Sequence, residues 1–154
     1  MENKFEYTDE MAKDKFVTYC NAQPWCKVIK RSKPGFAVWD VSFTSGDTNG
    51  NTINYIGEIK DRLKPSTYST NWYYEEKKHQ DLKEIKDKVQ LPTKIAYINF
   101  FTDDKIWIWD TTSIEEYKKP IPQAMKKQTM GNDKLITKSV YLMNKQETII
   151  KDIL

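Results

Sequence analysis

The sequence predicts a single α/β domain in which helices flank a mixed β-sheet. Its 154 residues are the usual length of one domain. Segments with helical periodicity alternate with apolar, strand-like runs along the chain, and this order is typical of an α/β fold. Aromatic residues make up 13% of the chain, and these large side chains can fill a core despite a charged fraction of 31%.

The first third of the chain predicts a helix, a strand and then a hairpin. Residues 8–20 have apolar side chains at helical spacing behind a threonine that can cap the helix. Residues 25–29 form a short apolar run that suits a strand. Further strands are predicted at 36–43 and 53–60, and the turn-forming run GDTNGN lies between them, so we expect an antiparallel pair.

The rest of the chain predicts a second helix and a return to the sheet. Residues 72–89 have helical periodicity and polar residues on one side. Residues 95–101 are strongly apolar, which suits a central strand covered on both faces, and residues 105–110 alternate as a strand does. Three further elements are expected: a short helix with a capping box at 113–116, a strand at 135–143 and a terminal helix at 147–154.

Several functional classes are excluded by what the sequence lacks. The single histidine, His79, lies in a charged stretch typical of an exposed helix face. A histidine-dependent hydrolase or a zinc site built from Cys and His is therefore not expected. Neither GxGxxG nor GxxxxGK[ST] occurs, so the common nucleotide-binding loops are absent. Chemistry based on carboxylates, lysines and a hard metal ion remains.

The sequence also favours a cytoplasmic protein without a membrane partner. No apolar run approaches the roughly 18–20 residues that a membrane span requires. The N-terminus, MENKFEYTDE, lacks the apolar segment of a secretory signal. Cys20 and Cys26 are too few for a disulfide framework, so we expect a reducing setting inside the cell.

The net charge of +3 comes from the last third of the chain. Residues 1–110 hold 17 basic and 17 acidic residues, whereas residues 118–138 hold six lysines against one aspartate. These lysines include Lys126, Lys127 and Lys138. We expect this stretch to be irregular, and it has two interpretations: a solvated surface, or an arm that contacts the phosphates of DNA, because lysine delivers point charge to a polyanion.

Reactive side chains are concentrated in the predicted hairpin. Strand alternation places Glu58 and Lys60 on one face, and pairing can bring Asp40 of the preceding strand beside Glu58. Two neighbouring carboxylates repel each other unless a divalent cation lies between them. With a lysine beside that cation, the arrangement can hydrolyse a phosphodiester. The alternative is a cross-strand salt bridge on a solvated face of the sheet.

The hairpin is part of the run WDVSFTSGDTNGNTINYIGEIKDR. This run resembles the core of the PD-(D/E)XK nuclease superfamily, and in particular of its small phage and prophage members. The resemblance extends over roughly residues 6–143. The early helix is followed in the expected order by EEKKHQDL, IAYINFF, KIWIWD and KSVYLM. It implies a restriction-endonuclease-like core. Trp39 stands before Asp40 where the family motif has proline, a mild departure.

The resemblance implies a role for each residue that matches the motif. Asp40 and Glu58 would bind Mg²⁺ or Mn²⁺ together with the backbone carbonyl of Ile59, and Lys60 would be the catalytic lysine. Glu10 on the first helix would be an accessory acid and metal ligand. Its alternative role is to complement the helix dipole in the first turn.

Residues beyond the motif have less specific assignments. Lys78 matches a lysine often found on the helix after the motif in the family. It would contact phosphate, and its alternative is an ordinary surface lysine. Arg62 would touch the backbone of the nucleic acid. Trp107 and Trp109 are expected in the core. For Trp72 we expect packing as well, with stacking on a base as the alternative.

These inferences predict a divalent-metal-dependent deoxyribonuclease that takes part in phage or prophage DNA metabolism in the cytoplasm of a bacterial host. The alternative is a catalytically inactive module on the same fold that binds nucleic acid or protein. The sequence leaves open the form of DNA that is cut, any sequence preference, the use of one or two metal ions, and whether two copies pair as a homodimer.

Overall fold

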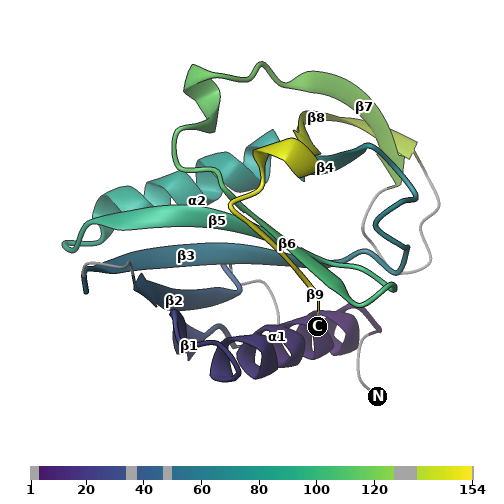
Figure 1. The fold of residues 1–154 in the computed structure, drawn as a ribbon. Helices are drawn as coiled ribbons and strands as arrows, with labels where there is room; N and C mark the ends of the chain where they lie inside the picture. The colour runs from purple at the N-terminus through teal and green to yellow at the C-terminus, as the bar shows by residue number, and fades with distance from the viewer. Residues whose placement is uncertain (1–3, 34–37, 47–49, 127–134, 154) are drawn as a thin grey trace.

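A computed structural model describes residues 4–33, 38–46, 50–126 and 135–153 of the chain. Within these ranges two sheets and two α-helices make up a mixed α/β fold, which confirms the predicted fold class (Figure 1). Helix α1 (Lys4–Asn21) covers one face of the larger sheet. Helix α2 (Glu76–Lys88) and the smaller sheet lie on its opposite face (Figure 1).

The larger sheet is mixed because one pair of central strands is parallel. Strands β3 and β5 run parallel, and the remaining neighbours in the sheet are antiparallel. The strand order is β1-β2-β3-β5-β6-β9. The bounds are β1 (Cys26–Arg31), β2 (Val41–Gly46), β3 (Thr52–Asp61), β5 (Thr93–Phe100), β6 (Lys105–Asp110) and β9 (Ile150–Ile153).

The smaller sheet is antiparallel and has the order β4-β8-β7. Its strands are β4 (Asn71–Glu75), β7 (Ile121–Lys126) and β8 (Leu135–Asn144). Two short 3₁₀ turns, η1 (Ile114–Glu116) and η2 (Lys145–Glu147), lie in the connections. The capping box predicted at Ser113 does not form, whereas Asn144 and Glu147 form one at η2.

Apolar side chains fill a core on each face of the larger sheet. Phe16 of α1 packs with Ile98 and Phe100 of β5 on one face. On the other face Tyr97 of the same strand packs with Leu82 of α2. Strand β5 is therefore covered on both faces, as its apolar sequence predicts. Each large apolar side chain buried in this way contributes about 1.5–3 kcal/mol to folding.

The helix predicted at 72–89 is wrong at its start, because residues 71–75 form β4. Trp72 and Tyr74 are buried while Asn71, Tyr73 and Glu75 are half-buried, which is the alternation of a strand. Strand β4 also pairs with β8, a partner about seventy residues further along the chain. Helical spacing of apolar residues after position 75 concealed this shorter strand signal.

Two predictions for the C-terminal region are also wrong. Residues 150–153 form β9 at the edge of the larger sheet, where the terminal helix was expected. Residues 121–126 form β7, where an irregular stretch was expected. Pro122 fits this strand because β7 lies at a sheet edge, where a missing backbone donor is tolerated.

Cys20 and Cys26 form a disulfide that joins the end of α1 to the start of β1, with 5.1 Å between their Cα atoms. Disulfides are typical of oxidising compartments. The disulfide contradicts the expectation of reduced cysteines, and the cytoplasmic location stays a prediction.

Among the described residues, no helix has both the length and the apolar character needed to cross a membrane.

Candidate active site

The predicted hairpin forms, and its pairing ends at the candidate site. The last β2–β3 pair is Val41 with Gly57, so the next step of the register places Asp40 opposite Glu58. The predicted strand at 36–43 begins only at Val41, and residues 34–37 lie outside the described ranges. Asp40 therefore lies where the two strands separate, and its N–H donates to the carbonyl of Gly57 at 2.9 Å.

Glu58 and Lys60 share one face of β3, as alternation predicts. Ile56 on this face packs in the core beside α2, whereas Ile59 packs in the core beneath α1. Glu58 is only 5% exposed, and its Oε1 lies 3.4 Å from Nζ of Lys60. A carboxylate buried to this degree requires charged or hydrogen-bonding partners.

The backbone of Ile59 faces Asp40. The Ile59 N–H donates to Oδ2 of Asp40 at 2.7 Å. In a strand the N–H and carbonyl of one residue point to the same side. The carbonyl of Ile59 therefore points toward the side of β3 on which Asp40 lies, which is the direction that a shared ligand position requires.

The electrostatics of the site raise the pKa of one acid and hold the neighbouring lysine in its charged form. Burial, followed by repulsion from Glu58, raises the pKa of Asp40 to about 7, although the Ile59 N–H and Lys60 oppose this rise. Burial alone would lower the pKa of Lys60, but Glu58, Tyr97 and Glu75 together outweigh it and the pKa is raised. Lys60 is thus a stable ammonium group at neutral pH.

Helix α2 supplies a second cation to Glu58. Nζ of Lys78 lies 3.7 Å from Oε2 of Glu58 and donates to the carbonyl of Val38 at 3.4 Å. The neighbouring Lys77 points away, is 84% exposed and pairs with Asp81. The structure therefore places Lys78 at the site and Lys77 on the outer surface of α2.

Of the two neighbouring acids on α1, Asp9 interacts electrostatically with the site and Glu10 does not. Glu10 pairs with Lys13 at 2.8 Å and with Arg31 at 2.7 Å. The pKa of Asp9 is raised, first by partial burial, and the charges that act on it include Lys60 and Glu58. The sequence contains a signal for this assignment. Asp9 has helical spacing to the buried Ala12 and Phe16, although its own side chain is exposed.

The helix also starts earlier than predicted. It begins at Lys4, so neither acid lies in the first turn, where the helix dipole acts.

The donors at the site suit a hard cation without forming a complete cage. In the parts of the chain that the structure describes, no three His, Cys, Asp or Glu side chains form a metal-binding group. The two carboxylates of Asp40 and Glu58 and the carbonyl of Ile59 are oxygen donors. Mg²⁺ is usually held by one or two carboxylates, with water and substrate phosphate completing its shell. The residues present fit such an ion.

Arg62 is engaged inside the protein. Its guanidinium donates to the side chains of Asn99 and Tyr97 and to the carbonyl of Tyr73, and it lies 5.5 Å from the ring centroid of Trp72. These contacts join β3 to β4 and β5. They do not support the predicted contact of Arg62 with nucleic acid.

The basic stretch is less cationic than its sequence indicates. Lys138 pairs with Glu75 at 2.6 Å, and Lys118 pairs with Glu147 at 2.7 Å. Both acids lie outside residues 118–138, so the sequence count did not include them. The side chains of Lys126 and Lys127 lie outside the described residues.

The tryptophans that the sequence placed in the core are buried there. Trp107 and Trp109 belong to the core on the α2 face of the sheet, and so does Trp72. Because Trp72 is 6% exposed, packing is confirmed as its role in place of base stacking.

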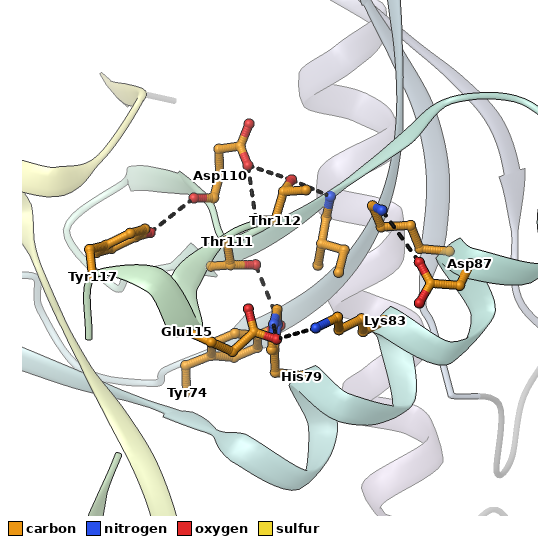
Figure 2. A network of polar contacts seen from close by, with 11 residues as sticks. Tyr74, His79, Lys83, Asp87, Asp110, Thr111, Thr112, Glu115 and Tyr117 are labelled. Atoms are coloured by element: carbon orange, nitrogen blue, oxygen red, sulfur yellow. Dashed lines mark hydrogen bonds and ion pairs between the residues drawn. The ribbon is translucent and has the colours of Figure 1, made fainter. Parts of the chain in front are cut away.

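His79 is fully buried, so its predicted place on an exposed helix face is wrong. Figure 2 shows the ring between Tyr74 of β4 and Glu115 of η1. The Tyr74 hydroxyl lies 3.0 Å from Nδ1, and Oε1 of Glu115 lies 3.2 Å from Nε2. Lys83 in turn donates to Glu115 at 2.9 Å. This network anchors α2, and thereby Lys78, to the smaller sheet.

We expect His79→Ala to lower the free energy of unfolding by about 2–4 kcal/mol, because it leaves a cavity and removes one of the two hydrogen-bond partners of the buried Tyr74 hydroxyl, which keeps only Thr111. Burial lowers the pKa of His79, although Glu115 partly opposes this. The stability that the neutral ring contributes is therefore complete above its unfolded pKa of about 6.5. It is lost as the pH falls through the lower pKa of the folded state. Urea unfolding of parent and variant across pH 4–8 measures both effects, and an unchanged pH slope in the variant would contradict them.

No family model, curated protein or solved structure matches this chain.

Proposed function

We propose that this chain is a deoxyribonuclease of the PD-(D/E)XK type that requires Mg²⁺ or Mn²⁺. The observation that carries the proposal is the convergence of Asp40, Glu58 and Lys60 where β2 separates from β3. A buried acid opposite a second acid is unfavourable for folding alone, and strained or costly groups of this kind cluster at functional sites. The phage or prophage setting belongs to the same proposal, since it rests on the resemblance. The bacterial cytoplasm is also part of the proposal, although the disulfide between Cys20 and Cys26 opposes it.

In this proposal the acids bind the cation and the lysines stabilise negative charge on the substrate. Asp40, Glu58 and the Ile59 carbonyl would hold the cation, which when bound neutralises phosphate oxygens and lowers the pKa of water. The Lys60 ammonium, fixed 3.4 Å from Glu58, is placed to orient water and to stabilise negative charge that develops on the phosphate. Lys78 is placed to hold a neighbouring phosphate.

A binding module without chemistry is the second candidate. It is favoured by the two ammonium groups that already neutralise Glu58, at 3.4 and 3.7 Å. In that case the acids and lysines would form a structural network, and a cation would not be required.

The deciding experiment incubates the full chain with supercoiled, linear, single-stranded and branched DNA. Each substrate is tested with Mg²⁺, with Mn²⁺ and with a chelator. Cleavage only with a divalent cation supports the nuclease. Binding without cleavage under all conditions would establish the binding module instead.

The adjacent lysines of α2 provide a matched pair of variants. We expect Lys78→Gln to lower kcat/KM for DNA by about 10- to 100-fold, the value of one hydrogen bond to a charged group. Lys77→Gln should leave it unchanged, because that side chain is 84% exposed and pairs with Asp81. Steady-state cleavage rates at fixed salt make the comparison. Equal effects of the two substitutions would show that α2 contributes only general positive charge.

A further inference from the structure

The connection after the site displays apolar side chains to solvent. Leu63 and Tyr68 are each 65% exposed and lie at either end of residues 63–68, the 63–68 loop. The loop begins directly after Asp61 and Arg62, at the end of the strand that bears Glu58 and Lys60. Exposed apolar side chains next to a candidate catalytic centre are candidates for substrate contact.

The 63–68 loop is held in place by hydrogen bonds. The N–H and hydroxyl of Ser66 donate to the carboxylate of Asp103 at 2.9 and 2.6 Å. The N–H of Thr102 donates to the carbonyl of Lys64 at 2.9 Å, and the N–H of Tyr68 donates to the carbonyl of Pro65 at 3.0 Å. The buried Ser66 thus ties the loop to the β5–β6 turn, so Tyr68 is presented by a preorganised backbone.

Leu63 adopts a conformation that the fold alone does not explain. Its φ of 54° is in the left-handed region, which costs a residue with a branched side chain about 1–3 kcal/mol. Burial of the side chain does not offset this cost, because Leu63 remains exposed. Backbone strain of this kind is concentrated at ligand-binding sites.

The aromatic ring has the surroundings of a stacking platform. Nζ of Lys64 lies 4.8 Å from the ring centroid of Tyr68, and the buried Trp72 lies 6.3 Å from it on the protein side. The ammonium lies over the face of the ring, so a base stacked there would displace it, and the displaced ammonium would then pair with a phosphate of the same strand. The sequence suggested Trp72 as a residue that stacks on a base. In the structure Trp72 is buried and packs against Tyr68 on the protein side.

The loop is close enough to the candidate centre to contact the same strand. Tyr68 lies eight residues after Lys60 in the sequence, so their Cα atoms are at most about 29 Å apart. With a rise of about 3.4 Å per nucleotide, this upper limit corresponds to about eight nucleotides.

We infer that Tyr68 stacks on an unpaired base of the DNA strand whose phosphate lies at Lys60, and that the substrate is single-stranded or has an unpaired end. This inference rests on the proposed function. Aromatic side chains stack on bases of any identity when the bases are free of a duplex, because every base has an apolar face. Within a duplex the neighbouring base pairs cover these faces, so an exposed ring selects for unpaired strands.

Binding of a fluorescein-labelled single-stranded oligonucleotide and of its duplex, measured by anisotropy in a chelator, tests the inference without cleavage. Tyr68→Ala should weaken single-strand binding by roughly 5- to 150-fold and leave duplex binding unchanged. Tyr68→Phe keeps the ring and should bind as the parent does. Thermal unfolding checks the fold of each variant.

A 2-aminopurine base moved along the oligonucleotide gives the register. Its fluorescence should be quenched by the parent at one position within about eight nucleotides of the cleaved bond and restored by Tyr68→Ala.

The outcomes separate this inference from the proposed function. If Tyr68→Ala binds the single strand as the parent does while the parent cleaves DNA with Mg²⁺, the function stands and the inference is wrong. Equal weakening for strand and duplex also overturns it, because Tyr68 would then be a general contact. If the parent neither binds nor cleaves any DNA, both are wrong, and the 63–68 loop would be a surface for a protein partner.

Discussion

Replacing Glu58 by glutamine is expected to reduce metal-dependent DNA cleavage by at least about 10³-fold. Glutamine keeps the shape of the side chain and removes its charge, so Asp40 is left as the sole carboxylate of the pair. The two ammonium groups at 3.4 and 3.7 Å lose their partner at the same time, which further disfavours a cation. Cleavage of supercoiled DNA across a titration of Mg²⁺ and Mn²⁺ measures the loss.

Asp61→Asn is the matched control for this substitution. Asp61 lies on the same strand, its side chain is 6% exposed like that of Glu58, and it pairs with Lys15 of α1 at 2.5 Å. It faces the opposite side of the sheet, so any loss of stability should leave cleavage by the folded protein unchanged. Parent-like cleavage by Glu58→Gln at saturating metal would show that the proposed site is wrong.

Lys60→Ala is expected to lower kcat by about 10²- to 10³-fold with little change in KM. The ammonium group acts on charge that grows in the transition state, whereas ground-state binding of DNA is spread over many contacts. Single-turnover cleavage together with binding in a chelator separates the two quantities.

The metal dependence of Lys60→Ala provides its internal control. Lys60 is not a proposed ligand, so the cation concentration for half-maximal rate should stay within about the same range as in the parent. A loss confined to KM, with a salt slope of binding that is flatter by about one phosphate, would make Lys60 an ordinary phosphate contact.

The candidate site was largely predictable because its geometry is local. Alternation along β3 places Glu58 and Lys60 on one face, and the turn-rich GDTNGN fixes an antiparallel partner for that strand. Register then places Asp40 opposite Glu58. These rules act over about twenty residues, so the sequence contained what was needed to relate the three side chains.

The choice between Asp9 and Glu10 lay at the limit of such rules. The two acids are neighbours and differ by about 100° around the helix, so only the buried stripe of Ala12 and Phe16 distinguishes them. Arg31 forms an ion pair with Glu10 because β1 lies beside α1. The two residues are about twenty positions apart in the sequence, so local rules do not predict this pair.

The sequence by itself determined the fold class, the central strand β5 and the hairpin that carries the acids, because periodicity and turn chemistry are local. Only the tertiary structure decided that residues 71–75 and 150–153 are strands, since each pairs with a distant segment. It also decided that His79 is buried and that Arg62 is engaged internally. Their partners Glu115 and Asn99 lie more than thirty residues away, and polar contacts across such distances leave no periodic signal in the chain.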